Sequence, residues 1–185
     1  GKLYRKSFLE SHDLWIPPYS YAEDKAHNFR CCACHPKYAF VPQSIVLYRE
    51  NLQSLTFRPK KDLMQNWILL ASDFEQFLKE KSLSRKYGDL IFFHLLIGAM
   101  YLAKEEMTYK GKKIRVVAKV LKKYHANPFV KEKLTWKACV HYTAHIQSLF
   151  WKALAFTLVF FLQVHAYSIL AAVLVLMSRL GIDSL

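Results

Sequence analysis

The side chains with the clearest potential for chemistry are thiols and imidazoles in the first third of the sequence. The segment from residue 31 to residue 35 reads Cys31-Cys32-Ala33-Cys34-His35. Zinc needs four such ligands in a tetrahedron, usually supplied by pairs spaced two to four residues apart. Cys31 and Cys32 are adjacent and Cys34 follows after one residue, so this segment cannot easily surround a metal ion alone.

A second group further along the chain offers matching ligands. Cys139 is followed by His141 and His145, and the two histidines lie four residues apart, on one face of a helix. Free cysteines are also common as small buried residues, and we expect that role here, with no metal and no cofactor. The glutamate that follows the first histidine of a metalloprotease helix is missing. The weak metal candidates are Cys32, Cys34, His35, Cys139, His141 and His145.

Polar residues inside an apolar stretch form the third group. Gln163, His165 and Ser168 lie within a long uncharged segment, where polar side chains usually face protein. His165 is a weak candidate for a haem ligand, and an interhelical hydrogen bond to a partner subunit is the simpler interpretation. The sequence has no nucleophile elbow, no phosphate-binding glycine loop and no dinucleotide fingerprint. We therefore predict a protein that is not an enzyme.

That uncharged segment, Ala153 to Met177, dominates the hydropathy pattern. Its 25 residues include no Asp, Glu, Lys or Arg. As one helix it would be roughly 37 Å long, and a hydrocarbon core is about 30 Å thick. Trp151 and Lys152 precede the segment and Arg179 follows it, as is typical of residues at a membrane interface. The pattern predicts a single transmembrane span at about 153–177.

The charge is strongly one-sided. The 185 residues carry 27 Lys and Arg against 14 Asp and Glu, and residues 1–146 hold 25 and 13 of these. A basic body suits anionic lipids, acidic neighbouring subunits or RNA, but basic residues scattered over several helices and an anchored chain argue against nucleic acid. The positive-inside rule places this body in the cytoplasm or the mitochondrial matrix. The initial Gly1 fits removal of a leader.

The rest of the chain divides into three parts. Residues 1–60 contain five of the six prolines and many aromatic residues, which predicts an extended arm with one short helix at Ser44–Leu55. Residues 61–126 form a basic helical body. Apolar residues at steps of three and four predict a helix from 61 to 81, and a second helix follows from about Arg85 to Glu105. The uncharged middle of that helix, within residues 87–103, is short for a membrane span, so we favour a packed helical hairpin.

Residues 112–124 predict a basic amphipathic helix that touches lipid. Asn127-Pro128 is a well-formed helix start, and no Pro or Gly follows until Gly181. We therefore predict one helix from 128 to 180 within a third part, residues 127–181, with a break near Gln147-Ser148 as the alternative. The predicted lipid headgroup contacts are Lys112, Lys113, Arg115, Lys119, Trp151, Lys152 and Arg179.

Taken together, these patterns predict an all-α, membrane-anchored protein with a single C-terminal span. Its expected function is that of a non-catalytic accessory subunit of a mitochondrial inner-membrane respiratory complex or ATP synthase, with the body in the matrix. Its expected partners are other subunits of the complex and anionic membrane lipids, with no nucleic acid. Two alternatives remain open: a membrane-anchored metal- or haem-binding protein, and a lipid-binding or membrane-remodelling protein.

Overall fold

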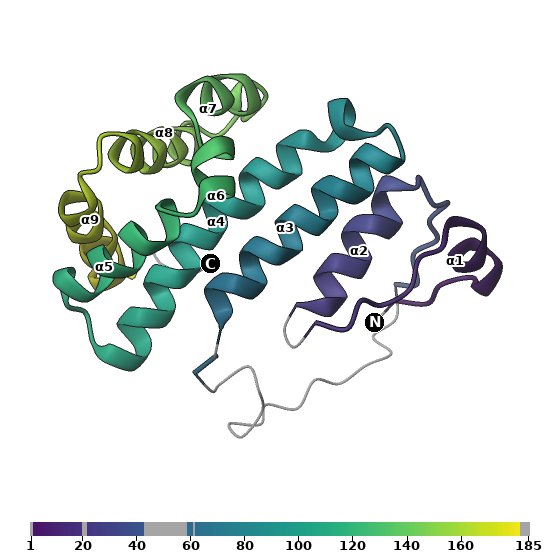
Figure 1. The fold of residues 1–185 in the computed structure, drawn as a ribbon, viewed down its shortest axis with the longest axis horizontal. Coiled ribbons are helices and arrows are strands. Elements are labelled where there is room, and N and C mark those ends of the chain that lie inside the picture. Colours follow the sequence, from purple (N-terminus) through teal and green to yellow (C-terminus); the bar gives the residue numbers. More distant parts are fainter. Residues whose placement is uncertain (1, 20–21, 43–58, 61, 182–185) are drawn as a thin grey trace.

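The computed structural model describes residues 2–19, 22–42, 59–60 and 62–181, and these residues form helices and no strand (Figure 1). The all-α prediction is confirmed for this part of the chain. The helices, in chain order, are α1 (Lys6–His12), α2 (Glu23–Ala33), α3 (Leu63–Glu80), α4 (Ser84–Lys110), α5 (Ile114–His125), α6 (Pro128–Lys133), α7 (Trp136–Thr143), α8 (Leu149–Gln163) and α9 (Tyr167–Arg179).

The predicted hairpin is present as α3 and α4, which run side by side through the middle of the molecule (Figure 1). The apolar stripe of α3 is buried against α4, as its spacing of three and four residues requires. Ser82, with a φ of 57°, turns the chain between them. The uncharged middle of α4 is buried within the protein, so the packed hairpin is confirmed.

Helix α5 covers the other side of α4 and is amphipathic as predicted. Val117, Leu121 and Tyr124 are buried, and the Tyr124 hydroxyl donates a hydrogen bond of 2.8 Å to the Leu95 carbonyl of α4. Helix α6 starts as predicted, because the Asn127 side chain accepts bonds from the two backbone amides at Phe129 and Val130.

The prediction of one helix from 128 to 180 is wrong. Thr135 and Ser148 each cap a new helix with a side-chain oxygen, at the starts of α7 and α8. The break near Gln147-Ser148 is therefore real. A further break follows α8, where His165 adopts a left-handed φ of 59°. Gly181, with a φ of 70°, follows the end of α9 as expected.

The predicted transmembrane span at about 153–177 is also wrong. The stretch is divided between α8, with 15 residues, and α9, with 13. At 1.5 Å per residue these helices are about 22 and 20 Å long, and a bilayer core is about 30 Å thick. Among the residues described, no helix combines the length and the apolar character needed to cross a membrane. The two helices instead pack on each other, and α9 lies along α5.

The extended, irregular N-terminal arm is a third correction, because it contains α1 and α2. Helix α2 begins with Glu23 and Asp24, whose charges favour a helix N-terminus, and it buries Ala26, His27 and Cys31. It packs against α3 and extends the layer formed by α3 and α4 (Figure 1). The short helix predicted at 44–55 lies outside the described residues.

Candidate functional site

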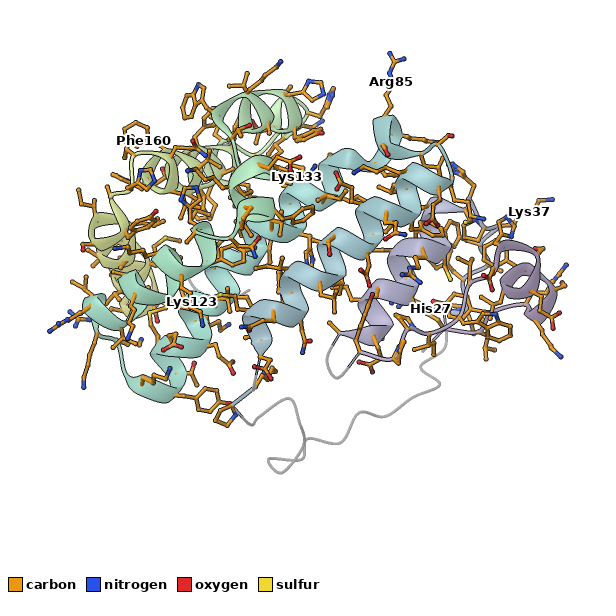
Figure 2. The ribbon with its side chains drawn as sticks, in the orientation of Figure 1. His27, Lys37, Arg85, Lys123, Lys133 and Phe160 are labelled. Carbon is orange, nitrogen blue, oxygen red and sulfur yellow. The ribbon has the colours of Figure 1, made fainter. Side chains whose placement is uncertain are left out.

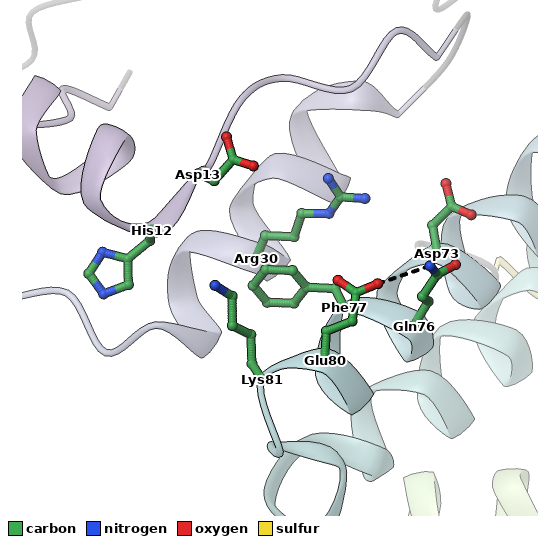
Figure 3. A pocket seen from close by; sticks show the side chains of 8 residues that line it. All are labelled: His12, Asp13, Arg30, Asp73, Gln76, Phe77, Glu80 and Lys81. Carbon is green, nitrogen blue, oxygen red and sulfur yellow. Dashed lines mark hydrogen bonds between the residues drawn. The ribbon is translucent and has the colours of Figure 1, made fainter.

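A polar pocket of about 320 Å³ lies where α1, α2 and α3 meet. Figure 3 shows its lining side chains, which come from the end of α1, from α2 and from the C-terminal half of α3. Most of them are charged or polar, so the pocket suits a polar or ionic ligand. They are His12, Asp13, Arg30, Asp73, Gln76, Phe77, Glu80 and Lys81.

Arg30 provides the pocket with a fixed positive charge. It lies in the last turns of α2, and its guanidinium carbon is 5.7 Å from the centre of the Phe77 ring on α3. Phe77 is buried, so the ring gives the guanidinium a rigid support and leaves its N–H groups available. Lys81, directly after α3, adds a second, exposed cation. Two neighbouring cations of this kind are suited to bind phosphate or carboxylate groups.

The carboxylate of Asp73 is held by the segment between α1 and α2. The Tyr19 hydroxyl donates a hydrogen bond to Asp73 Oδ2. Burial, together with this hydrogen bond, raises the pKa of Tyr19 to about 12, so the phenol stays protonated and remains a donor at neutral pH. Tyr19 thereby connects the N-terminal segment to α3 on one side of the pocket.

His12 and Asp13 form the edge of the pocket at the end of α1. His12 Nδ1 lies 3.0 Å from the Phe8 carbonyl, which can only accept a hydrogen bond. When this bond forms, Nδ1 carries the proton and Nε2 keeps a lone pair. Asp13 has a left-handed φ of 53°, a conformation that Asp tolerates better than most residues. Its carboxylate is exposed and accepts no hydrogen bond from the described residues.

Two further carboxylates, Glu80 in the pocket and Asp24 outside it, each accept one hydrogen bond. Glu80 accepts a hydrogen bond of 2.9 Å from Gln76, one turn earlier on α3 (Figure 3). Outside the pocket, Asp24 in the first turn of α2 is exposed, and one of its oxygens accepts from the Lys25 amide at 2.7 Å. Asp24 and Arg30 are six residues apart, about 9 Å along the helix axis. An exposed carboxylate with free lone pairs can accept a proton from a hydroxyl group.

The predicted metal ligands are not brought together. In the ranges that the structure covers, no group of three or more His, Cys, Asp or Glu side chains is placed to hold a metal ion. Cys32 accepts a bond from the Tyr38 hydroxyl, and His35 contacts Lys86 and Tyr87 of α4. Cys34 caps the end of α2. Cys139 is buried in α7, whereas His141 and His145 are exposed, and α7 lies far from α2 (Figure 1).

Two of the three residues predicted to contact partner subunits inside a membrane, Gln163 and His165, contact side chains or backbone of this same chain. Gln163 donates a hydrogen bond of 2.6 Å to the Leu134 carbonyl, so it joins the end of α8 to the end of α6. The His165 ring lies 5.6 Å from that of His125 and 5.8 Å from that of Tyr167. Ser168, in the first turn of α9, is exposed.

Five of the seven predicted headgroup contacts lie on or beside α5 and the end of α9, and the other two lie on α8. Lys112 donates a hydrogen bond of 3.0 Å to the Ser178 carbonyl, which places the start of α5 beside the end of α9 and Arg179. Lys113 precedes α5 as its N-cap residue. Arg115 and Lys119 are exposed on α5. Trp151 and Lys152 lie in the first turn of α8.

The chain is similar in sequence to a bacterial protein. Over 139 residues, 25% are identical to "Putative glycosyltransferase EpsH" of Bacillus subtilis (strain 168). The similar region covers 73% of this chain and 40% of that protein, so the chain spans less than half the length of its relative. No protein-family model matches the chain, and no solved structure matches it either.

This similarity overturns the functional expectations. A stretch covering most of the chain resembles a protein described as an enzyme, which contradicts a non-catalytic subunit of a respiratory complex or ATP synthase. The similarity likewise gives no support to the two alternatives, a membrane-anchored metal- or haem-binding protein and a lipid-binding or membrane-remodelling protein. The expected location in the mitochondrial inner membrane depended on the transmembrane span and on that class of complex, and both are contradicted.

Sequence reasoning missed the pocket because its residues are far apart in the chain. His12, Arg30 and Asp73 come from three separate elements, and two of those elements lie in the region predicted to be irregular. One signal was present: Glu23 and Asp24 are adjacent acidic residues that favour the start of a helix.

Proposed function

We propose that the chain functions in glycosyl transfer, the movement of a sugar from an activated donor to a hydroxyl group of an acceptor. The observation that carries this proposal is the similarity over 139 residues to "Putative glycosyltransferase EpsH". Because the chain spans 40% of that protein, the proposal concerns the part that this region plays in the reaction. The polar pocket between α1, α2 and α3 is the site proposed to take part.

The chemistry of the pocket fits a sugar linked to phosphate. Sugar hydroxyls both donate and accept hydrogen bonds. In the pocket the carboxylates of Asp73 and Glu80 can accept from them, and the Gln76 amide can donate and accept. A phosphate leaving group gains negative charge as its bond to the sugar breaks. Arg30 and Lys81 would stabilise that charge, because preorganised cations lower the barrier most where charge develops.

Glycosyl transfer also needs a base that removes the proton from the attacking hydroxyl. The base must be exposed to the acceptor and must keep a free lone pair. Asp13 at the edge of the pocket and Asp24 in the first turn of α2 are two of the described carboxylates that meet these requirements. Both are retained as candidates, and they are distinguished by the substitutions given in the Discussion.

Binding of donors tests the proposal directly. Saturation-transfer NMR with a panel of nucleoside diphosphate sugars should show contact between the chain and at least one donor. Arg30→Gln should weaken that binding by about tenfold or more, because a hydrogen bond to a charged group contributes roughly 1.5–3 kcal/mol. Arg85→Gln is the matched control, because Arg85 is exposed and points away from the body at the start of α4 (Figure 2).

Two outcomes would contradict the proposal. One is the absence of binding by every donor at millimolar concentration while circular dichroism shows a folded helical protein. The other is binding that Arg30→Gln and Arg85→Gln weaken equally, because the interaction would then reflect only the net charge of +13.

A further inference from the structure

Helix α8 is apolar on both of its sides. Leu154, Leu158 and Leu162 face the core and are at most 9% exposed. At 100° per residue, five outward positions fall within an arc of about 80°. All five are apolar, and they form what we call the α8 outer face: Leu149, Ala153, Phe156, Phe160 and Val164.

Most of the α8 outer face is open to solvent. The exposed fraction is 82% for Leu149, 47% for Phe160 and 52% for Val164, and Figure 2 shows the Phe160 ring projecting from the protein. Trp136 of α7 extends the surface, because its ring lies 5.2 Å from that of Phe156 and 6.5 Å from that of Phe160. A helix with apolar side chains on every side is normally buried on every side by protein or lipid. A contiguous exposed surface of this kind marks an interaction site.

The part of the chain that carries the α8 outer face is strongly basic. Residues 107–182 contain 12 Lys and Arg and one acidic residue, Glu132. Lys152 lies on α8 itself, and Arg179 with Lys112 lies at the far end of α9. Helix α5 packs along α9 (Figure 1). Arg115 and Lys119 of α5 are exposed. The partner that fits these groups therefore has both an apolar interior and a negatively charged surface.

We propose that the α8 outer face docks on the surface of an anionic lipid bilayer without crossing it. A helix lying in the interface buries its apolar side about 5–10 Å deep, and basic residues around it bind the headgroups. Trp136 and Trp151, both about half exposed, have the side chain that is enriched at this level of a bilayer. Lys152 can extend its charged end toward the headgroups while its stem stays among apolar atoms.

Vesicle flotation with the full chain tests this proposal. One set of vesicles contains only phosphatidylcholine, and the other contains phosphatidylcholine with about 30% phosphatidylglycerol. Binding is expected to the anionic vesicles and to fall as salt is raised. Phe160→Ser combined with Leu149→Ser should weaken binding at least tenfold, because each substitution removes a large apolar side chain whose transfer from water into the bilayer favours binding. The matched apolar control is Phe40→Ser combined with Leu3→Ser, two residues that are over 90% exposed in the N-terminal region.

A charge series separates the electrostatic contribution. Arg115→Gln with Lys119→Gln should weaken binding to anionic vesicles by about tenfold or more, whereas Lys2→Gln with Lys37→Gln should have little effect. Folding of each variant is checked by its helical circular dichroism and its melting temperature. These measurements need no sugar donor, so their result is independent of the proposed glycosyl transfer.

Three results would overturn the proposal: no flotation with anionic vesicles, equal flotation with neutral vesicles, or no loss on changing Phe160 and Leu149. Size-exclusion chromatography with light scattering distinguishes a protein partner. If the chain is a dimer that Phe160→Ser converts to monomer while flotation is unchanged, the α8 outer face is covered by a second copy and the lipid proposal is wrong.

Discussion

Trp67 and His94 each bond to the other residue's backbone. The Trp67 indole N–H donates to the His94 carbonyl at 2.8 Å, and His94 Nε2 lies 3.0 Å from the Trp67 carbonyl. Their rings stack with centres 4.6 Å apart and planes 10° from parallel. Both side chains are buried between α3 and α4. This reciprocal contact fixes the position of one helix of the hairpin along the other.

Stability should depend on pH through His94. Burial, with a contribution from nearby Lys25, lowers the pKa of His94 to about 3 from an ordinary value of 6.5. Between these values the unfolded chain binds a proton that the folded protein does not, so the free energy of unfolding falls as the pH is lowered. The expected slope is roughly 1 kcal/mol per pH unit, measured by urea denaturation. His94→Gln should lose this slope, whereas the exposed control His145→Gln should keep it.

Gly98 on α4 cannot accept a side chain. A Cβ atom there would lie 2.3 Å from Trp67 Nε1 and 2.8 Å from the Tyr124 hydroxyl oxygen, both of which are held by hydrogen bonds. Gly98→Ala should therefore lower the free energy of unfolding by about 1–3 kcal/mol despite the better helix propensity of Ala. Gly88→Ala is the control on the same helix, because its close neighbour is the end of the Tyr142 side chain at 3.0 Å. Equal effects at the two glycines would show that this packing is wrong.

The ion pair between Lys133 and Glu75 joins α6 to α3. Burial opposes ionisation of Glu75, but hydrogen bonds from Lys133 and Lys79 outweigh it and lower the pKa of this carboxyl group below its ordinary value of 4.5. Lys133→Met should lower the free energy of unfolding by about 1 kcal/mol at pH 7. The stabilisation is present above pH 4.5 and is lost as the pH falls through the pKa of the folded state.

Lys131→Met is the control for this ion pair, because Lys131 is exposed on the same short helix. It should change stability by less than about 0.5 kcal/mol. If the Lys133 and Lys131 substitutions cost the same at pH 7, or if the difference between them persists in acid, the pair does not stabilise the fold.

Three of the four cysteines should react with iodoacetamide in an order set by exposure. Cys32 is exposed, whereas Cys31 and Cys139 are buried, and burial raises the pKa of each buried thiol to about 11. The thiolate is the reactive form, so Cys32 should be modified first and the two buried thiols only on unfolding. Peptide mass spectrometry after timed quenching measures the order. Early modification of Cys139 in the folded protein would contradict its burial in α7.

The two candidate bases should separate in an assay of glycosyl transfer, measured as release of nucleoside diphosphate. Loss of a general base lowers the rate about 10²–10⁴-fold, so either Asp13→Asn or Asp24→Asn should have an effect of this size while donor binding is retained. The other substitution should change the rate by much less. Glu10→Gln, on exposed α1, is the control. If both Asp variants remain fully active, neither residue is the base.

Local patterns predicted the middle of the chain well. Three signals are each contained within a few residues: the apolar spacing of three and four residues in α3, the helical spacing of apolar residues among basic ones in α5, and the Asn127-Pro128 start of α6. Such signals report a helix and its buried side directly. The hairpin could be predicted for the same reason.

The C-terminal half could not be predicted in this way, because the residues at which its helices end and begin give only weak sequence signals. Thr135 and Ser148 are capping residues, but both also occur inside helices. The decisive break is at His165, where a residue other than glycine adopts a left-handed conformation. Local propensity disfavours that choice, and the packing of α8 and α9 onto α4 and α5 compensates for it. The pocket could not be predicted from the sequence either, because Arg30 and Asp73 come together only through tertiary packing.

The left-handed turn at His165 has a consequence for synthesis of the protein. Until α8 and α9 dock on α5, the chain presents 25 consecutive uncharged residues to its surroundings. Exposed apolar segments of this kind in incompletely folded chains are prone to aggregation and are bound by chaperones. Substitutions that slow formation of the turn should therefore reduce the yield of protein in the cell more than they reduce the stability of the protein once it has folded.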